Sequence, residues 1–580
     1  MRAALVVSLL LAPSLAQAVR WQVPERGGVL FQRTIAVDAK TEPAGASFPE
    51  VWSGATQPGT MLAGELDVER QRRAAPVWDL RELVAQLGLD LGNSRAGTSQ
   101  VHVEPAGRFQ PVRVDATYGP VAGDGKQSFT ARIEFDAKAA RMQEVPPSLP
   151  RLQGHVKGSR VIDRAKGLVV RLDGTAELTL DVAAHKEGSD ATPAMQQTVR
   201  ITDAWLDPVV LAPNDAEFKG RVVDAIVSAV ALLRKRLAAK LDAGHEKGTD
   251  PHHDVQTGEL ALLLLALLRA GENGRDPLLA RGLEELQRRV IEDTYSLAVA
   301  ILAIEALHTP ANEWAELRAG RLQAPFARAL TPEQLELLRG WVRSLVDNVD
   351  TSVGAKSVRR WSYGPAKTWD NSNTQYALLG LYAAHLCGVE VPSTVWGGAA
   401  EHLLACAREH GHPDALDLAR NRDVEKGGRG RVTASREQPR AWEYGDDREP
   451  TGSMTVAGVG GLTLCGAALR LQRKGSAKLL ADIDAAVRGG FLWLQQHFTV
   501  RRSCGPLEQS AVWHHYYMYG LERACELNQV AWIGGRDWYF EGALNLIASQ
   551  GKEGNWGEDN DSAFGLLFLK KAALPVVTPR

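Results

Sequence analysis

The polar and aromatic residues that could support chemistry gather in short segments of the C-terminal two thirds of the chain. Aromatic plates beside carboxylates and amides are suited to binding sugar rings. Two carboxylates about 5–10 Å apart would suit glycoside hydrolysis, whereas a Tyr or His beside an Asn would suit proton abstraction in a lyase. The sequence does not give these separations, so no catalytic residue is assigned. The candidates for lining one cavity are Trp369, Asp370, Asn371, Trp442, Tyr444, Asp446, Asp447, Trp513, His514, His515, Tyr516, Trp556, Glu558 and Asp559.

The same segments also have a structural interpretation. Asn371, Ser453 and Asp561 stand where helices are expected to begin, and side chains of these types satisfy the free N–H groups of a helix start. A tryptophan shortly before such a start would cover the helix end as a large rigid plate. We expect this packing and capping role for these residues and for Trp361, Trp442 and Trp556.

The cysteines predict neither a metal nor a cofactor. There are five, at positions 387, 406, 465, 504 and 525, and no C-x-x-C pair occurs. An odd number leaves at least one thiol free or paired between chains. Most lie in apolar helical sequence, which favours buried structural thiols.

The elements that must position these residues are helical after about residue 215. Val222, Ile226, Val230, Leu233 and Leu237 follow the spacing of a helix face. Segments with a polar or aromatic start and a small-residue-rich apolar continuation recur six times, at residues 257, 294, 373, 453, 514 and 561. More highly charged amphipathic helices are expected between them, at 220–241, 277–290, 331–348, 393–409, 477–497 and 537–549. The first set predicts an inner ring and the second an outer ring; an open α-solenoid is the alternative.

The linkers carry a resemblance to a known repeat. Residues 550–556 read Q-G-K-E-G-N-W, and the spacing Q-x3-G-x-W resembles the repeat signature of squalene cyclases and protein prenyltransferases. W-S-Y-G at 361–364 precedes D-N-S-N-T-Q-Y at 370–376, and W-E-Y-G at 442–445 precedes G-S-M-T at 452–455. These pairs look like exported bacterial proteins with prenyltransferase/squalene-oxidase-type repeats, over about residues 220–575. The resemblance implies an α/α toroid of six hairpins, a fold that hosts cyclases, transferases, lyases and binding domains.

The catalytic residues of these relatives do not carry over. The D-x-D-D acid of the cyclases is absent, and the nearest string is D-N-D-S at 559–562. The prenyltransferase zinc set needs an Asp two residues before a Cys, which no Cys here has. A thioester of the complement-like toroids needs Cys and Gln three apart, but Cys504 and Gln509 are five apart. Whether the chain is an enzyme is left open, with the balance against it.

The N-terminal part of the chain alternates with a period of two. Phe129, Ala131 and Ile133 share one face of an expected strand, which predicts an antiparallel sheet or sandwich with one wet side. Leu168 to Leu172 and Ala176 to Val182 are expected to form a hairpin around Asp173-Gly174, with a three-residue loop or a bulge.

The first residues predict export. Arg2 precedes the apolar run Ala3 to Ala12, and Ala16-Gln17-Ala18 has the form of a cleavage site. An N-terminal membrane anchor is the alternative, but the apolar run is short for one. The predicted domains are a signal peptide at 1–18, a loop-rich and antiparallel β domain at 19–210, and the toroid at 215–576. The location is periplasmic or extracellular.

Together these features predict a multidomain protein, with an N-terminal antiparallel β domain followed by an all-α six-hairpin α/α toroid. The formal charge of 67 − 69 = −2 argues against a generally basic nucleic-acid binder. The favoured function is binding or scaffolding at the toroid mouth, with a glycan, lipid or protein ligand and no membrane span after signal removal. The rivals are a carbohydrate-active hydrolase or lyase and a terpenoid-cyclase-like enzyme that use the same cavity.

Overall fold

A computed structural model describes residues 28–39, 50–56, 97–103, 112–137, 151–163, 168–181, 195–244, 255–310, 312–318, 321–322, 325–350, 358–364, 369–420, 431–446, 449–504 and 513–572. The chain divides into two compact units, Met1–Pro213 and Asn214–Arg580. The described part of the first unit is built from strands, and that of the second mostly from helices. The prediction of an antiparallel β region followed by a helical region is therefore confirmed.

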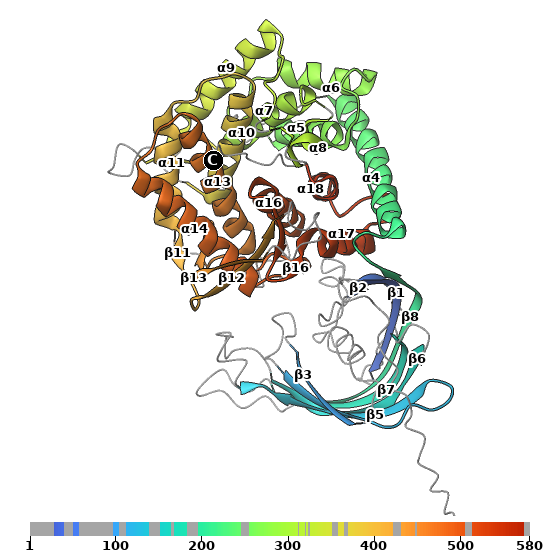
Figure 1. The fold of residues 1–580 in the computed structure, drawn as a ribbon. Coiled ribbons are helices and arrows are strands. Elements are labelled where there is room, and N and C mark those ends of the chain that lie inside the picture. Colours follow the sequence, from blue (N-terminus) through green and yellow to red (C-terminus); the bar gives the residue numbers. More distant parts are fainter. Residues whose placement is uncertain are drawn as a thin grey trace, which may run out of the picture. The chain divides into compact units, whose positions relative to one another are not determined.

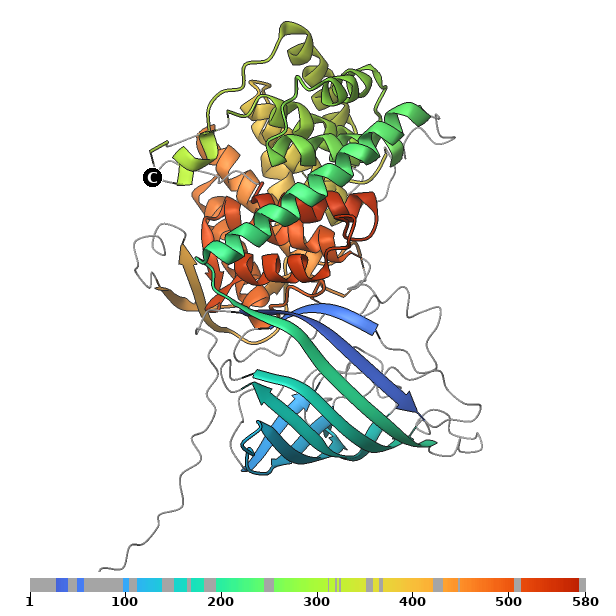
Figure 2. The same cartoon turned by 90° about the vertical axis from the view of Figure 1, so that its right-hand side faces the viewer.

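The described strands of the first unit form one curved antiparallel sheet, in the order β2-β1-β8-β7-β6-β5-β4-β3 (Figure 2). In β5, Phe129, Ala131 and Ile133 are buried between exposed neighbours, as a sheet with one covered face requires. The strands are β1 Gly28–Ala39, β2 Glu50–Thr56, β3 Gly97–Val103, β4 Val112–Tyr118, β5 Lys126–Phe135, β6 Arg151–Asp163, β7 Leu168–Asp181 and β8 Met195–Leu211.

The predicted hairpin at Asp173-Gly174 is wrong, because β7 runs straight through both residues. Gly174 pairs with Gly158 of β6 on one side and with Ile201 of β8 on the other. A Cβ at Gly158 would lie 2.2 Å from the Asp173 carbonyl oxygen, so glycine is needed for this close approach of two strands. The Asp173-Gly174 pair lies where β7 passes close to β6, and it does not form a turn.

The helices of the second unit alternate between two sets (Figure 1). We call α5, α7, α10, α13, α16 and α18 the inner ring, and α4, α6, α9, α11, α14 and α17 the outer ring. The inner ring comprises α5 Val255–Ala270, α7 Thr294–Leu307, α10 Asn371–Leu386, α13 Gly452–Leu471, α16 His514–Leu527 and α18 Asp559–Lys570. The outer ring comprises α4 Ala216–Ala243, α6 Pro277–Arg288, α9 Pro332–Asp347, α11 Ser393–Cys406, α14 Ala477–Gln496 and α17 Trp538–Ser549. The short α8 spans Glu313–Arg318 between α7 and α9.

Packing joins the inner ring into a cycle. Each of its helices contacts the next one along the chain, and α18 contacts α5. The outer helices α4, α6, α9, α11, α14 and α17 each pack against the inner ring. An open solenoid would leave its first and last inner helices without this contact.

Small residues let the inner helices approach closely. A Cβ at Gly380 of α10 would lie 2.8 Å from the Ala298 Cα of α7. Within the described residues, α13 is the helix long and apolar enough to cross a membrane, but 83% of its apolar window is buried in the protein. Its position in the inner ring accounts for its sequence, since a helix surrounded by others is apolar on every side.

Short strands lie between the helices and were not predicted. β12 Asp414–Arg420, β13 Arg431–Glu437, β15 Val530–Ile533 and β16 Arg536–Asp537 form a sheet in the order β13-β12-β15-β16. β9 Val349–Asp350 pairs with β10 Arg360–Trp361, and β11 Arg408–Glu409 pairs with β14 Arg440–Ala441.

Candidate functional site

The first turns of the inner helices gather at one rim of the ring, which we call the mouth. In α7, α10 and α13, the backbone N–H of the first residue donates to a carbonyl oxygen of the following linker. Each linker therefore caps the inner helix of the repeat before it. The bonds run from Thr294 to Tyr363 at 2.8 Å, from Asn371 to Tyr444 at 2.9 Å, and from Gly452 to Cys504 at 2.6 Å.

Three linker tryptophans each make the same two kinds of hydrogen bond, one from the indole and one from the backbone. The indole N–H of Trp361, Trp442 and Trp556 donates at 2.7–2.8 Å to a carbonyl near the end of an outer helix: Leu345, Leu403 and Leu546. The backbone N–H donates to a hydroxyl of the next inner helix: Thr374, Thr455 and Ser562. All three side chains are buried. Trp442 and Trp556 thus join inner to outer helices, as the packing interpretation expects.

Asp370 and Asn371 act at the start of α10. Asp370 accepts from the backbone N–H of Asn373 at 2.7 Å and from its side-chain amide at 2.9 Å. Burial raises the pKa of Asp370 above its usual value. The Asn371 amide donates to the Glu443 carbonyl at 2.8 Å. Both residues are buried. The cap of α10 is Asp370 and not the expected Asn371, which is the first residue of the helix.

Trp369 lies against His402 of α11, with ring centroids 4.6 Å apart. His402 Nε2 is 3.2 Å from Asn371 Oδ1, and Cys406 lies next to the imidazole. These are the residue types of a Cys–His–Asn nucleophile, a cluster that the sequence analysis did not assemble. The Cys406 sulfur is 3.8 Å from Nδ1 and 3.7 Å from Nε2.

Nearly equal distances to both ring nitrogens place the Cys406 sulfur over the imidazole face. It does not lie along the lone pair of either nitrogen, so His402 is not aligned to take its proton. Burial also raises the pKa of Cys406 to about 12. The thiol stays protonated at neutral pH, and the contact is packing.

The other predicted residues of this linker differ in exposure. Tyr444 is half-buried, and its carbonyl oxygen accepts a hydrogen bond from the Asn371 backbone N–H. The Asp446 side chain is exposed, and Asp447 lies outside the described residues. The linker therefore places the Glu443 and Tyr444 carbonyls against Asn371 and leaves the Asp446 carboxylate exposed.

The start of α16 presents three different environments. Trp513 is 61% exposed, whereas His514 is buried and its Nε2 lies 2.8 Å from the Val500 carbonyl oxygen. His515 Nδ1 lies 3.2 Å from Asp561 Oδ1, and its Nε2 has no hydrogen-bond partner among the described residues. A carboxylate that accepts from Nδ1–H leaves the lone pair on Nε2, the arrangement of an oriented general base.

Glu558 and Asp559 lie where α18 begins. The Asp561 carboxylate accepts from the Glu558 backbone N–H at 3.3 Å. Asp559 Oδ1 is 3.2 Å from Arg236 Nε of α4. Asp561 therefore joins the α18 start to His515, and Asp559 joins it to the outer ring.

An aromatic line leads from the mouth into the inner ring. The exposed Trp513 lies 6.5 Å from Tyr516, Tyr516 lies 6.1 Å from Tyr376, and Tyr376 lies 4.7 Å from Tyr295, all between ring centroids. Tyr376 and Tyr295 were not among the candidates. In the sequence, each of the two is an aromatic residue at the start of an apolar helix. That feature belongs to the repeated segments and did not distinguish them as site residues.

Tyr516 connects two inner helices that are not neighbours in the ring. Its hydroxyl donates to Gln375 Oε1 of α10 at 2.9 Å and lies 3.1 Å from Ser372 Oγ. Burial raises the pKa of Tyr516 above its usual value. The phenol therefore stays neutral and links α16 to α10 across the ring.

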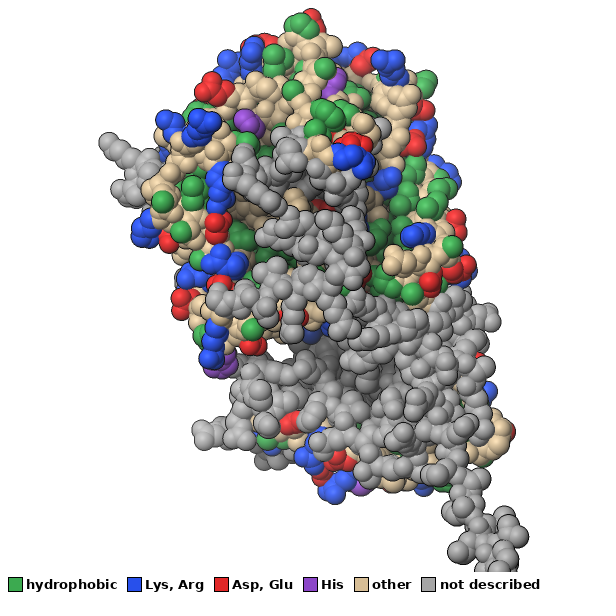
Figure 3. Space-filling view, in the orientation of Figure 1, with side chains coloured by type: hydrophobic (Ala, Val, Ile, Leu, Met, Phe, Trp, Pro, Cys, Tyr) green, Lys and Arg blue, Asp and Glu red, His purple; other side chains and the backbone are tan. Residues whose placement is uncertain are grey.

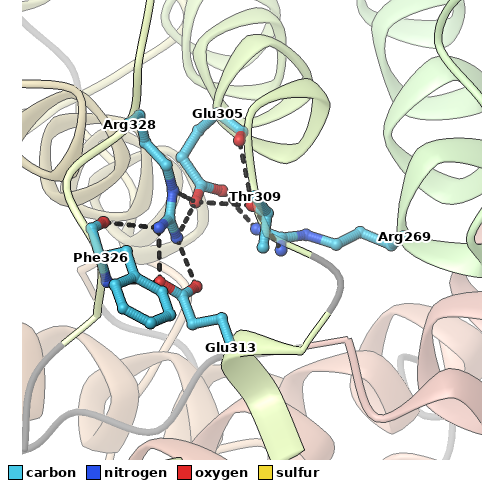
Figure 4. A network of polar contacts seen from close by, with 6 residues as sticks. All are labelled: Arg269, Glu305, Thr309, Glu313, Phe326 and Arg328. Atoms are coloured by element: carbon cyan, nitrogen blue, oxygen red, sulfur yellow. Dashed lines mark hydrogen bonds and ion pairs between the residues drawn. The ribbon is translucent and has the colours of Figure 1, made fainter. Parts of the chain in front are cut away.

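The opposite rim carries a buried charge network (Figure 4). Arg328 pairs with Glu305 of α7 and with Glu313 of α8, each at 2.6 Å. Arg269 of α5 also pairs with Glu305. The Arg328 and Glu313 side chains are fully buried. This network attaches the segment after α8 to the ends of the inner helices.

A cavity of about 500 Å³ also lies at this opposite rim and not at the mouth. Exposed Glu390 and Lys474 give it one charge of each sign. In the described ranges, no group of three His, Cys, Asp or Glu is placed to hold a metal ion. The cavity is lined by His385, Gly388, Val389, Glu390, Val391, Ser393, Gln472 and Lys474.

Comparison with known proteins gives no assignment. No protein-family profile and no curated protein matches the chain. A family 76 glycoside hydrolase from a bovine Bacteroides thetaiotaomicron strain is similar over 82% of this chain and 98% of its own, with 8% identity and a TM-score of 0.34. Lipovitellin is similar over 87% of this chain and 57% of its own, with 9% identity and a TM-score of 0.18. At such TM-scores neither likeness carries an argument, so the function must be argued from the chain itself.

Proposed function

We propose that the second unit is a six-hairpin α/α toroid that binds a ligand at its mouth, in a protein exported to the periplasm or the extracellular space. The observation that carries this proposal is the aromatic line from exposed Trp513 through Tyr516 to Tyr376. Binding sites combine aromatic surface with a few fixed polar groups. The hydroxyls and the amide of Ser372, Tyr516 and Gln375 supply those groups here.

The roles of the other polar residues favour binding over catalysis. Asp370 is used as a helix cap, Asn371 as a linker contact, and Cys406 as a packed thiol. Basic and acidic side chains are interspersed over the described surface in Figure 3. The line from Trp513 to Tyr376 offers aromatic rings and neutral hydrogen-bonding groups, so ligand choice along it rests on stacking and hydrogen bonds. A glycan fits this chemistry best, and a polyprenyl lipid or a protein segment are the other ligand classes.

Binding is tested by a screen of glycans and polyprenyl lipids on the mature chain from Val19. We expect one class to bind, and Trp513→Ala to weaken that binding about tenfold, since one well-packed aromatic contact contributes roughly 1.5 kcal/mol. Val227→Ala is the matched control, because Val227 on α4 is equally exposed at 61%. Equal binding by both variants would show that the mouth is not the ligand face.

A carbohydrate-active enzyme is the second candidate, favoured by the His515–Asp561 pair. His515 has the orientation of a general base, with Nε2 lacking a partner in the described part of the chain. Its role is tested with His515→Gln and with the glycan found in the screen. Loss of turnover with binding preserved would establish the enzyme. Absence of turnover in the unmodified chain would leave a binding protein.

A further inference from the structure

Within the described residues, Arg523 is a buried cation that makes no hydrogen bond of normal geometry. It lies in the second half of α16, and the residue is 2% exposed. None of its three side-chain nitrogens has a hydrogen-bond partner among the described residues. The guanidinium lies 4.2 Å from the Tyr519 ring centroid and 5.3 Å from that of Tyr376. It is therefore enclosed by aromatic faces, and no acceptor among the described residues meets it with normal hydrogen-bond geometry.

Other buried arginines of this chain are satisfied. Arg328 has a fully buried side chain and donates to Glu305, to Glu313 and to the Phe326 carbonyl. Arg160 of the first unit donates to Gln127 at 2.8 Å. A guanidinium cannot lose its proton in a protein, and a buried charge without a partner is costly. Arg523 thus differs from Arg328 and Arg160, the other two arginines that are buried among the described residues.

A second polar group without a partner lies beside it. The Tyr376 hydroxyl is buried and has no partner of normal hydrogen-bond geometry in the described structure. Burial raises the pKa of Tyr376 to about 12, and the nearby Arg523 charge opposes this rise. Tyr376 belongs to α10 and Arg523 to α16, so the two donors reach the interior from different sides of the ring.

Glu522 is the described carboxylate whose attraction acts most strongly on Arg523. Glu522 precedes it and is also buried, and the attraction between the two charges acts without a hydrogen bond to Arg523. Phe564 of α18 stacks on Tyr519 with centroids 5.8 Å apart. The interior thus offers aromatic faces, one hydroxyl and the five N–H donors of one guanidinium.

We propose that Arg523 and Tyr376 recognise a carboxylate carried on a ring-shaped ligand that enters from the mouth. The planar guanidinium matches a carboxylate with two parallel hydrogen bonds, and the tyrosine hydroxyl supplies a third donor. One cation without a hydrogen-bonded partner selects a singly charged group over a polyphosphate. The aromatic faces accept the flat side of the ligand ring. This inference rests on the proposed ligand binding at the mouth and names its ligand class.

Two sources share this chemistry: a uronic acid of a glycan and an aromatic carboxylic acid. The test measures the melting temperature of the full mature chain with galacturonate, with benzoate and with neutral glucose. We expect one of the two acids, and not glucose, to raise the melting temperature in a concentration-dependent manner. The acid that does so identifies the source.

Arg523→Met and Tyr376→Phe connect the effect to these two residues. Arg523→Met should abolish the acid-dependent rise in melting temperature, because it removes the cation that receives the carboxylate. Tyr376→Phe should keep the fold and weaken acid binding about tenfold. The exposed Arg339→Met on α9 is the control and should retain the full response.

Two results would overturn the inference. One is an unmodified chain that neither acid stabilises, and the other is an acid response that persists in Arg523→Met. If a neutral glycan binds in the earlier screen, depends on Trp513 and is unaffected by Arg523→Met, the mouth remains the ligand face and only the carboxylate assignment fails.

Discussion

Trp556 is fixed through both of its nitrogen atoms. Its indole N–H donates to the Leu546 carbonyl and its backbone N–H to the Ser562 hydroxyl. Its six-membered ring also occupies the space beside Gly565, where a Cβ would lie 2.7 Å from the indole. The side chain therefore connects α17 to α18, and removing it leaves a cavity and an unsatisfied carbonyl.

Trp556→Ala should lower the free energy of unfolding by about 3–5 kcal/mol, as expected for a truncated buried aromatic residue. Urea denaturation followed by circular dichroism measures the change. The exposed Trp513→Ala should stay within about 0.5 kcal/mol of the unmodified chain. Equal stability of the two variants would contradict the structural role of Trp556.

At the residue scale, the sequence predicted the local interactions and missed the distant ones. Residue type and spacing put the cap of α10 at Asn371, one residue from Asp370, which accepts from the N–H three residues further on. The bond from Tyr516 to Gln375 joins residues 141 positions apart. Such a pair follows only from the closure of the ring, and the Arg523 site depends on the same closure.

At the scale of single elements, two helix glycines differ in the space around them. A Cβ at Gly458 of α13 would lie 2.3 Å from the Trp442 ring, whereas a Cβ at Gly220 of α4 would meet nothing within 4 Å. Gly458→Ala should therefore destabilise the chain by about 1–3 kcal/mol through overpacking. Gly220→Ala should stabilise it by about 0.5–1 kcal/mol, because alanine favours a helix.

Thermal unfolding of the two glycine variants measures this contrast. The expected shifts in melting temperature have opposite signs, so a general effect of adding a methyl group cannot produce both. A stabilising Gly458→Ala would show that Trp442 does not pack against α13 at this position.

The charge network at the opposite rim should respond strongly to the loss of its centre. Arg328→Met leaves the Glu305 and Glu313 carboxylates buried without their shared partner. The expected loss is about 3–5 kcal/mol of unfolding free energy, measured by urea denaturation. Arg339→Met, which removes a half-exposed arginine of α9, should change stability by less than about 0.5 kcal/mol. A similar result for both variants would show that the network contributes little.

At the element scale, periodicity predicted the helices well and one strand poorly. In the sequence, apolar residues recur at even-numbered positions from Leu168 to Val182, with glycine at 174, which is the pattern of a single strand. The Asp173-Gly174 pair outweighed that signal and led to the wrong turn. β12 and β13 were missed because no alternating apolar pattern identified them. β12 pairs with β13 on one side and with β15 on the other, and all three lie between helices.

The stability of the whole chain should fall at alkaline pH. Burial raises the pKa of Tyr376, Tyr382, Cys387 and Cys406 to about 12 in each case. In the unfolded chain these groups ionise near pH 10 for Tyr and 8.5 for Cys. Because the folded pKa values lie above the unfolded ones, this contribution to stability is complete below about pH 8 and is lost as pH rises through about 9–12.

Urea denaturation between pH 7 and 11 measures the alkaline loss. Each group contributes a slope of up to about 1.4 kcal/mol per pH unit once its unfolded form ionises. Cys406→Ala removes one such group, so its slope between pH 9 and 11 should be smaller than that of the unmodified chain. An identical slope would show that the Cys406 thiol ionises freely in the folded state.

At the scale of the whole molecule, the two-part organisation could be predicted because it changes the period of the apolar pattern. Packing between α18 and α5 could not be read from any single helix, since it joins the first and last inner helices. The six repeated helix-start segments suggested that the ring closes. The contact between α18 and α5 supplies the physical reason, because both helices would otherwise expose an apolar flank.

The two ends of the helical unit meet at one helix. Phe218, near the start of α4, packs on Phe540 of α17 with ring centroids 4.7 Å apart. The neighbouring Tyr539 hydroxyl donates at 2.8 Å to the Leu569 carbonyl near the end of α18. A circular permutant that joins these ends and opens the chain at an exposed turn elsewhere would keep every one of these helix pairs. The packing of these helices thus does not depend on which helix of the unit is synthesised first.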